Sequence, residues 1–282
     1  MESVNNIAAV RERVAGWRRQ GASVALVPTM GNLHRGHLRL VELALERADR
    51  VVVSIFVNPM QFGAEDDFDR YPRTLQRDHD ALTAAGAHLL FAPAAHEMYP
   101  DGIARSSVIG VPSLERILEG EFRPGHFQGV ATVVAKLLNI ALPDMAVFGQ
   151  KDYQQLLVIE RMVRDLCMAV EIVAGPIVRD DDGLALSSRN QYLSLDERRR
   201  APELHRCLLA ARQRVLDGDR RWSRIESEAM DRLKSAGFEP DYFSIRSAGQ
   251  LEVPREEHRE LVLLAAARLG ATRLIDNLRV DL

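Results

Sequence analysis

Residues 23–45 read SVALVPTMGNLHRGHLRLVELAL, and this stretch carries the pattern of a strand, a loop and a helix. Ser23 to Val27 is a short apolar run that ends at Pro28, and the residues after Gly36 place apolar side chains at helical spacing. A strand that leads through a loop into a helix is the repeating unit of a parallel α/β sheet. The stretch therefore predicts an α/β fold.

The loop in this stretch predicts a nucleotide phosphate site. A helix N-terminus directs unpaired backbone N–H groups and the positive end of the helix dipole outward, which favours bound phosphate. Gly31 and Gly36 lack a Cβ and so allow a tight turn and close approach of the backbone to a ligand. His34 and His37 are three residues apart and would share one face of the first helical turn.

Two other interpretations of these histidines stay open, namely half of a zinc site and an inert helix start. A zinc site needs further ligands, but Cys167 and Cys207 have no Cys or His partner at a ligand spacing, and the H-E-x-x-H pattern is missing. The spacing alone favours a phosphate site without securing it.

Strands and helices alternate through the first two thirds of the chain. After an N-terminal helix and the strand and helix above, the pattern predicts strands at 51–57, 88–92, 146–148 and 170–173, and helices at 72–85, 128–141 and 153–166. Continuous apolar runs separated by helices are typical of a parallel sheet covered on both faces. We therefore expect a Rossmann-like, doubly wound parallel sheet, with ligands at the carboxyl ends of its strands.

The pattern changes past Pro176, which predicts a second domain. Two long charged helices, 196–217 and 222–236, precede three short strand-like runs, 241–246, 261–267 and 272–275. We expect residues 1–176 to form the doubly wound domain and residues 177–282 a smaller α+β domain.

The composition is that of a globular protein, with 282 residues, 46% hydrophobic residues and a formal net charge of −3. It does not indicate a nucleic-acid partner. Two cysteines 40 positions apart suit a reducing compartment. The N-terminus lacks the apolar run of a signal peptide, and no run is long enough to cross a bilayer. We expect a cytoplasmic protein without a membrane partner.

Two further segments carry polar groups suited to phosphate. Lys151, in FGQKDYQQ (148–155), can supply a compact positive charge, and Asp152 can cap the following helix or help to place a metal. In LSSRN (186–190), two hydroxyls and a guanidinium suit closure over a triphosphate. The simpler alternatives are a solvated lysine with a plain N-cap, and an ordinary turn.

Five motifs together resemble one family along the length of the chain. In order, they are PTMGNLHRGH (28–37), FVNPMQF (56–62), RPGHFQGVATVV (123–134), GQKDYQQL (149–156) and LSSRN (186–190). Their order and separations resemble the pantothenate synthetases, also called pantoate–β-alanine ligases. The H-x-G-H pattern identifies only a superfamily of nucleotidylyltransferases and class I aminoacyl-tRNA synthetases, whereas NPMQF and KDYQQL point to this member.

The resemblance implies a two-step ligation that supplies a coenzyme A precursor. (R)-Pantoate attacks the α-phosphorus of ATP to give pantoyl adenylate and pyrophosphate, and the amine of β-alanine then displaces AMP to form pantothenate. Mg²⁺ is expected to bridge the β and γ oxygens of ATP, with protein ligands that the resemblance leaves unassigned. It further implies a homodimer, an ATP- and pantoate-binding role for residues 1–176 and a lid role for residues 177–282.

The resemblance also implies roles for individual residues. For catalysis they are His34, His37 and Lys151, with His37 as the general acid. For ATP they are Met30, Gly31, Asn32, Leu33, His34, Arg35, Gly36, His37, Gly149, Gln150, Lys151, Asp152, Val178, Leu186, Ser187, Ser188 and Arg189. For pantoate they are Gln61 and Gln155 with an apolar wall of Pro28, Met30, Val133 and Val134, and Gln61 is also implied for β-alanine.

Two positions depart from the family pattern. Gln150 stands where glutamate is usual, and Leu186 where methionine often precedes the serines. Arg123 and His126 either cover the substrate site or flank a simple turn at Pro124. Two rival functions remain at this point: another adenylyl transferase of the superfamily, which would not need pantoate, and a noncatalytic module descended from a synthetase.

Overall fold

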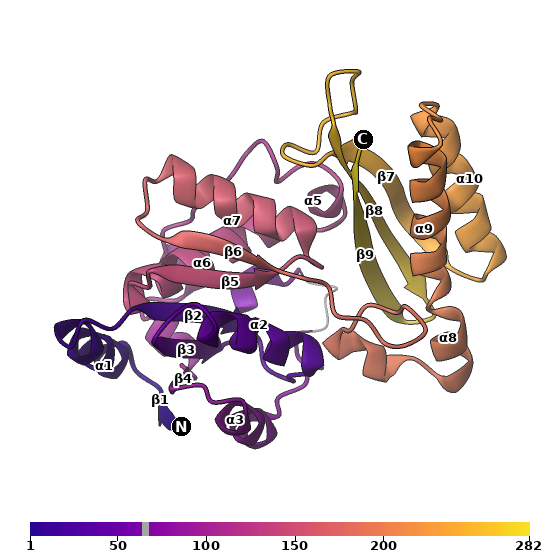
Figure 1. Ribbon diagram of the computed structural model, residues 1–282. Coiled ribbons are helices and arrows are strands. Elements are labelled where there is room, and N and C mark those ends of the chain that lie inside the picture. Colours follow the sequence, from indigo (N-terminus) through magenta and orange to yellow (C-terminus); the bar gives the residue numbers. More distant parts are fainter. Residues whose placement is uncertain (64–67) are drawn as a thin grey trace. The chain divides into compact units, whose positions relative to one another are not determined.

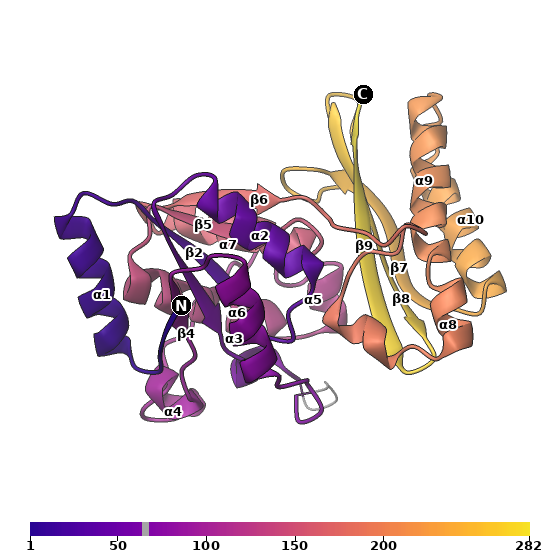
Figure 2. The same cartoon turned by 60° about the horizontal axis from the view of Figure 1, so that its bottom comes forward.

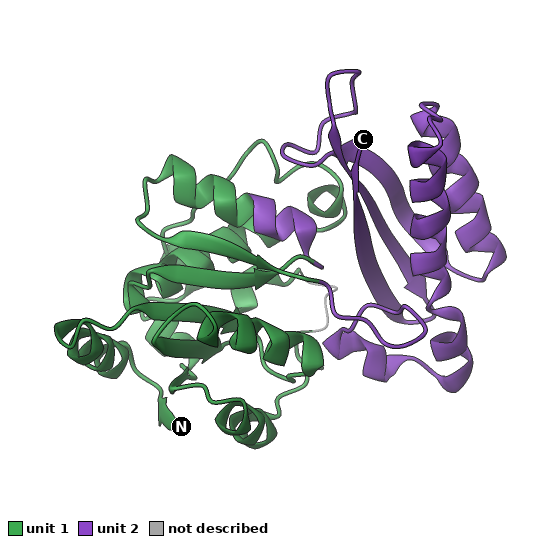
Figure 3. Cartoon of the chain, viewed as in Figure 1, with its two compact units in different colours: residues 1–150, 158–176 green, residues 151–157, 177–282 purple. Residues whose placement is uncertain are grey.

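The chain folds into two units in a computed structural model that describes residues 1–63 and 68–282. The first unit comprises Met1–Gln150 and Val158–Pro176, and the second comprises Lys151–Leu157 and Ile177–Leu282 (Figure 3). Residues 151–157 thus group with the second unit, although the expected division lay at residue 176. Whether the two units act as a substrate-binding domain and a lid stays a prediction.

A parallel sheet of six strands forms the centre of the first unit (Figure 1). Its order is β1-β4-β3-β2-β5-β6, and the strands are β1 (Glu2–Val4), β2 (Val24–Thr29), β3 (Arg50–Ile55), β4 (Leu89–Phe91), β5 (Met145–Gly149) and β6 (Glu171–Gly175). All the strand pairs are parallel. The expected Rossmann-like doubly wound fold is confirmed.

Helices pack against both faces of this sheet, with α2 (Arg35–Leu45) on one face and α1 (Ile7–Arg19) and α6 (His126–Ala141) on the other. The remaining helical segments up to residue 165 are α3 (Leu75–Ala84), α4 (Ala95–Met98), α5 (Glu119–Phe122) and α7 (Tyr153–Asp165), with 3₁₀ turns η1 (Pro59–Gln61) and η2 (Ile103–Arg105). Ala25 and Val27 belong to a buried cluster with the apolar face of α2, and α2 lies against β2 and β5 (Figure 2). Successive side chains of a strand point to opposite faces, so Leu26 lies on the face where α1 and α6 pack.

The strand order reverses at β2, and this reversal predicts the position of the ligand site. β2 pairs with β3 on one side, Val27 opposite Val53, and with β5 on the other, Ala25 opposite Met145. In doubly wound sheets, ligands bind beyond the carboxyl ends of the strands at such a switch point. Those ends are Thr29 of β2 and Gly149 of β5, and both are followed by motifs singled out in the sequence.

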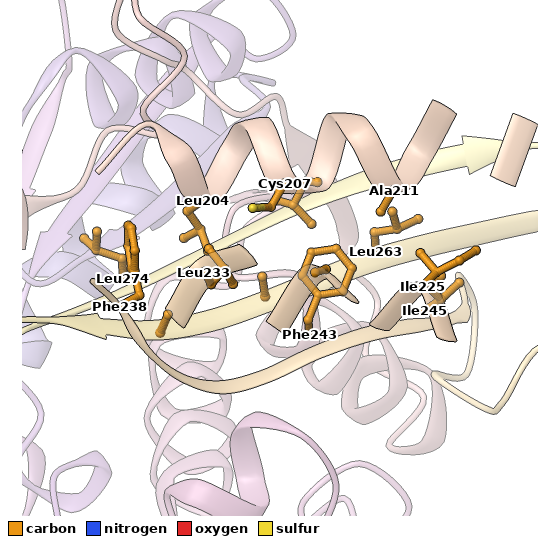
Figure 4. Packing of buried hydrophobic residues seen from close by; sticks show 14 of the residues in the cluster. Leu204, Cys207, Ala211, Ile225, Leu233, Phe238, Phe243, Ile245, Leu263 and Leu274 are labelled. Carbon is orange, nitrogen blue, oxygen red and sulfur yellow. The ribbon is translucent and has the colours of Figure 1, made fainter. Parts of the chain in front are cut away.

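The second unit has an antiparallel sheet in the order β7-β8-β9. Its elements are η3 (Ser188–Tyr192), α8 (Leu195–Arg200), α9 (Glu203–Leu216), α10 (Trp222–Ser235), β7 (Glu239–Ser247), β8 (Glu260–Leu269) and β9 (Thr272–Asp281). The helices α9 and α10 cover one face of the sheet, and side chains such as Leu204, Leu233 and Phe243 fill the core between them (Figure 4).

Several expected elements differ from those observed. The helix expected at 196–217 is two helices, α8 and α9, because Pro202 lacks an N–H and its ring would clash inside one continuous helix. The edge strand β1 was not expected, since it has three residues and no buried apolar run. β9 extends from Thr272 to Asp281 rather than stopping at 275, because the polar but buried residues Asp276 and Asn277 interrupt its apolar pattern.

No helix in the described part of the chain has both the length and the apolar composition that a membrane span requires.

Candidate nucleotide and substrate site

A buried carboxylate holds the loop between β2 and α2. Asp78 of α3 is 1% exposed, and its two oxygens accept the backbone N–H groups of Asn32 and Leu33, each at 2.8 Å. Thr74 donates to the same carboxylate at 3.1 Å. Gly31 has φ +83°, and a Cβ there would lie 3.1 Å from Asp78 Oδ2, so only glycine fits this turn without a shift. Asp78 therefore sets the loop that precedes the H-x-G-H pattern.

We expect Asp78→Asn to lower the free energy of unfolding by about 1–3 kcal/mol, because an amide offers one acceptor oxygen where two buried N–H groups need one each. Denaturant unfolding measures this effect. Asp80→Asn is the matched control, since it makes the same change to an exposed carboxylate of the same helix. Equal stability of the two variants would contradict the role assigned to Asp78.

His34 and His37 form a reciprocal cap at the start of α2. The backbone N–H of Gly36 donates to His34 Nδ1 at 3.1 Å, and the backbone N–H of His34 donates to His37 Nδ1 at 3.3 Å. The pattern is a capping box in which imidazoles replace the usual hydroxyl and carboxylate. The two rings lie side by side, with centroids 4.0 Å apart.

This cap determines which ring nitrogen carries the proton. A backbone N–H can only donate, so Nδ1 accepts in both rings, and the neutral imidazoles carry their proton on Nε2. The Gly36 N–H is used within the cap, although the sequence suggested the first-turn N–H groups as phosphate donors. Both histidines thus have Nε2–H as their donor, beside the positive end of the α2 dipole. In the described residues, no three His, Cys, Asp or Glu side chains gather as a metal site.

Gln61 lies in a buried polar network that begins at Asn58. Asn58 caps η1 and donates from Nδ2 to Gln61 Oε1 at 3.3 Å and to the carbonyl of Gly129 at 3.0 Å. The Tyr99 hydroxyl donates to Asn58 Oδ1 at 2.7 Å, and burial raises the pKa of Tyr99 to about 12. That hydroxyl therefore remains a donor at neutral pH. Gln61 Nε2 in turn lies 3.1 Å from the sulfur of Met30, so the fold brings these two predicted substrate residues together.

Arg123 and His126 hold the backbone of Gln61. His126 Nδ1 is 2.8 Å from the carbonyl oxygen of Gln61, and His126 Nε2 is 3.2 Å from Arg123 Nη1. A guanidinium only donates and a carbonyl only accepts, so Nε2 accepts and Nδ1 donates. Arg123 also lies 3.6 Å from Glu119. The RPGHF segment, whose role was open, thus supports the 3₁₀ turn that carries Gln61.

The remaining predicted residues of the first unit lie at the end of β5, on β2 and on α6. Gly149 ends β5, and the Gln150 N–H donates to the Gly175 carbonyl at 2.8 Å. Pro28 is half-buried on β2. Val133 and Val134 are buried on α6, the helix that packs against η1.

In the second unit, Lys151, Asp152 and Gln155 lie at the start of α7. Lys151 and Gln155 are half-buried and Asp152 is exposed. The Lys151 carbonyl accepts a hydrogen bond from Asn277 Nδ2 at 2.9 Å. The Lys151 ammonium makes no ion pair with the residues that the structure describes. Among those residues, no carboxylate neutralises the charge of Lys151.

A small hairpin carries the other predicted phosphate residues. The Leu186 N–H donates to the Val178 carbonyl at 2.9 Å, and Arg179 and Ala185 form a β-bridge. Ser187 caps η3 by accepting the Arg189 N–H at 3.3 Å, and Ser188 begins that turn. The cavity beside the hairpin is lined by Lys151, Ser187, Asn190, His205 and Asp276. Lys151 and Ser187 therefore face one space within this unit.

Comparison with known proteins places the chain in a family. Residues 2–279 match the family model described as pantoate-beta-alanine ligase. The chain belongs to the pantoate-beta-alanine ligase family. The resemblance deduced from the five motifs is confirmed, and membership of this ligase family separates the chain from the rival adenylyl transferases and noncatalytic modules.

Similar proteins span the full length of this ligase-family chain. It is 56% identical to pantothenate synthetase of Stutzerimonas stutzeri over 282 residues, which cover 100% of this chain and 99% of that one. It is 47% identical to a Thermus thermophilus pantothenate synthetase structure, with TM-score 0.91 and 99% of each chain covered. A Francisella tularensis pantoate-beta-alanine ligase structure, described as complexed with beta-gamma ATP and beta-alanine, is 33% identical with TM-score 0.80, covering 99% of this chain and 97% of that one.

The sequence patterns missed Asp78, Asn58, Asp276 and Asn277 as supports of the predicted site residues. A lone carboxylate on an amphipathic helix is indistinguishable from a solvated one until the helix is packed. For Asn58 a signal existed, since an asparagine directly before proline is typical of a cap or turn.

Proposed function

We propose that this ligase works in the two steps that its family resemblance implies. A carboxylate oxygen of (R)-pantoate forms a bond to the α-phosphorus of ATP as pyrophosphate leaves. The β-alanine amine then forms a bond to the acyl carbon of pantoyl adenylate as AMP leaves and the amine loses a proton. The observation that carries the proposal is the H-x-G-H cap at the switch point of the sheet, in a chain that matches the family over residues 2–279.

His34, His37 and Lys151 are the proposed catalytic residues. The Nε2–H groups of both histidines would donate to phosphate oxygens, because their Nδ1 atoms already accept backbone N–H groups. Adenylyl transfer, like phosphoryl transfer, needs positioning and charge neutralisation more than covalent assistance. The Lys151 ammonium and the Ser187–Arg189 loop would stabilise the charge that develops as pyrophosphate leaves.

Mg²⁺ is proposed to accompany ATP, and it would neutralise charge on the β and γ oxygens. Mg²⁺ in nucleotide sites is usually held by phosphate oxygens, waters and one or two carboxylates. Asp152 is the exposed carboxylate next to Lys151, so its oxygen fits this donor set. It would hold the ion or one of its waters.

Gln61 and Gln155 are the proposed pantoate residues, and Gln61 also serves β-alanine. Amides orient hydroxyl and carboxylate groups without pairing the carboxylate to a full charge, which would keep it nucleophilic. Pro28, Met30, Val133 and Val134 are the proposed apolar wall. The contact between Gln61 and Met30 at 3.1 Å supports a shared role.

A role for Gln61 leads to a prediction for Gly129. A Cβ at Gly129 would lie 2.5 Å from the Met60 carbonyl oxygen and 2.6 Å from the Gln61 Cα. We expect Gly129→Ala to cost about 1–3 kcal/mol of stability through overpacking and to raise the KM for pantoate. Denaturant unfolding and steady-state kinetics measure the two effects.

The control is Gly16→Ala in α1, where the nearest atom to a new Cβ is the end of Arg19 at 3.8 Å. That substitution should stabilise the protein by about 0.5–1 kcal/mol, since glycine is disfavoured inside helices. A Gly129→Ala protein that binds pantoate as tightly as wild type would contradict the proposed role of Gln61.

Exchange of labelled pyrophosphate into ATP tests the proposed function. With Mg²⁺, exchange is expected only when pantoate is present, and AMP should be released when β-alanine is added. Absence of exchange with pantoate, Mg²⁺ and ATP would overturn the adenylate step, and exchange without pantoate would indicate a different acceptor.

A homodimer and a cytoplasmic location are further proposals. The cytoplasmic proposal is supported by the two cysteines, neither of which is in a disulfide. Light scattering is expected to give twice the 31.6 kDa chain mass for the dimer, and a value equal to one chain would contradict it.

A further inference from the structure

We infer that Asp276 and Asn277, neighbours on β9, are a pair of positioning residues that hold the two phosphate-binding segments of the second unit. One residue supports the backbone at Lys151 and the other supports the hairpin that leads to Ser187. The inference rests on the proposed function, because that function assigns Lys151 and the Ser187 loop to ATP. Neither residue belongs to the five motifs.

Asn277 supports Lys151 directly. Its side chain is buried, with 3% exposure, and its Nδ2 donates to the Lys151 carbonyl at 2.9 Å. Its own backbone N–H donates to Asp276 Oδ1 at 2.7 Å. A backbone carbonyl held by a buried side chain has little freedom to shift, so the origin of the Lys151 side chain is fixed relative to β9.

Asp276 supports the hairpin through Arg179. It is 4% exposed and accepts both terminal nitrogens of Arg179, at 2.6 and 2.8 Å, in a bidentate pair. Arg179 also donates to the Gly183 carbonyl at 3.0 Å, which closes the hairpin turn. Although burial opposes the charge, His205 and Arg179 lower the pKa of Asp276, so the carboxylate is ionised at neutral pH.

The two supports lie on opposite faces of one strand. Adjacent strand residues project to opposite sides, so Asp276 contacts the hairpin and His205 of α9, whereas Asn277 contacts the Lys151 segment. β9 is the edge strand of its sheet and pairs with β8 along its full length, from Glu260 opposite Asp281 to Leu269 opposite Thr272. A single rigid strand therefore sets the separation of the Lys151 segment and the Ser187 loop, which line the same cavity.

The two supports should affect different kinetic parameters, kcat for Asn277 and the KM for ATP for Asp276. A misplacement of about 1 Å in a catalytic group can cost on the order of 100-fold in rate. Asn277→Ala should therefore lower kcat for pyrophosphate exchange about 10- to 100-fold and leave the KM for pantoate unchanged. Asp276→Asn should raise the KM for ATP, because the hairpin loses the charge that holds Arg179.

A double-mutant cycle distinguishes positioning from general stability. If Asn277 acts through Lys151, adding Asn277→Ala to a Lys151→Ala protein should cause no further loss of exchange rate. A purely structural role would lower the rate in both backgrounds. Ser244→Ala is the control, because it alters a buried polar residue of the same sheet that contacts Glu226 rather than Lys151.

If the Asn277→Ala protein does not fold, the same double-mutant cycle is measured with Asn277→Leu, because leucine is similar in size to asparagine. Wild-type kcat in either folded variant, or an undiminished effect in the Lys151→Ala background, would overturn the inference. Failure of the proposed function can be told apart from failure of this inference, because in the first case the wild-type protein itself would show no pantoate-dependent exchange.

Discussion

Lys151→Ala is expected to lower kcat for pantoate-dependent pyrophosphate exchange by a factor on the order of 10²–10³. The adenylyl group in transfer and the departing pyrophosphate concentrate negative charge, and a preorganised cation is most valuable where that charge develops. The Lys151 ammonium makes no ion pair among the described residues, so no internal carboxylate competes for it. For the same reason, its removal should leave the unfolding transition unchanged.

The chain contains three lysines, and one of them, Lys234, is a matched control for Lys151. Lys234 is exposed and lies 3.4 Å from Asp231 on the surface of α10, so Lys234→Ala should leave both rate and stability unchanged. Lys151→Arg should recover part of the lost rate, because arginine keeps the charge but presents it as a planar fork. Equal rates for Lys151→Ala and Lys234→Ala would contradict a catalytic role for Lys151.

His37→Glu is expected to fold normally and to lose exchange activity by a factor on the order of 10²–10³. Glutamate at this position of a capping box accepts the His34 N–H as the imidazole Nδ1 does. It cannot donate to phosphate and adds a negative charge next to it. The substitution therefore keeps the structural function of His37 and removes the chemical one.

His37→Gln is the companion variant. Its side-chain oxygen can accept the His34 N–H, and its amide nitrogen restores a neutral donor. We expect it to retain more activity than His37→Glu at similar thermal stability, as measured by exchange rates and calorimetry on both proteins. Near-wild-type rates in both variants would show that His37 serves only to cap α2.

Family membership and fold class were accessible from sequence because both depend on local patterns. The apolar run before Pro28 and the helical spacing after Gly36 arise from neighbouring residues, and the parallel sheet follows from their repetition. The ends of elements were less accessible. Pro202 divides one expected helix into α8 and α9, and β1 has too few apolar residues to show a pattern.

The supports of the site required the fold. Asp78 is 46 residues from the Asn32 N–H that it accepts, and Asn277 is 126 residues from the Lys151 carbonyl. Nothing in the residues around either one distinguishes it from a surface polar residue, since burial and partner depend on how distant elements pack.

By itself, the sequence determined that this chain has a doubly wound parallel sheet, an H-x-G-H helix start and the motifs of a pantoate-beta-alanine ligase. Tertiary structure alone decided the buried anchor at Asp78 and the supports on β9, whereas the tautomers of His34 and His37 follow from a cap within four consecutive residues. The physical reason is the distance along the chain between the residues that interact. Periodicity and motif spacing express interactions between neighbours along the chain, whereas a buried hydrogen bond depends on elements that only packing brings together.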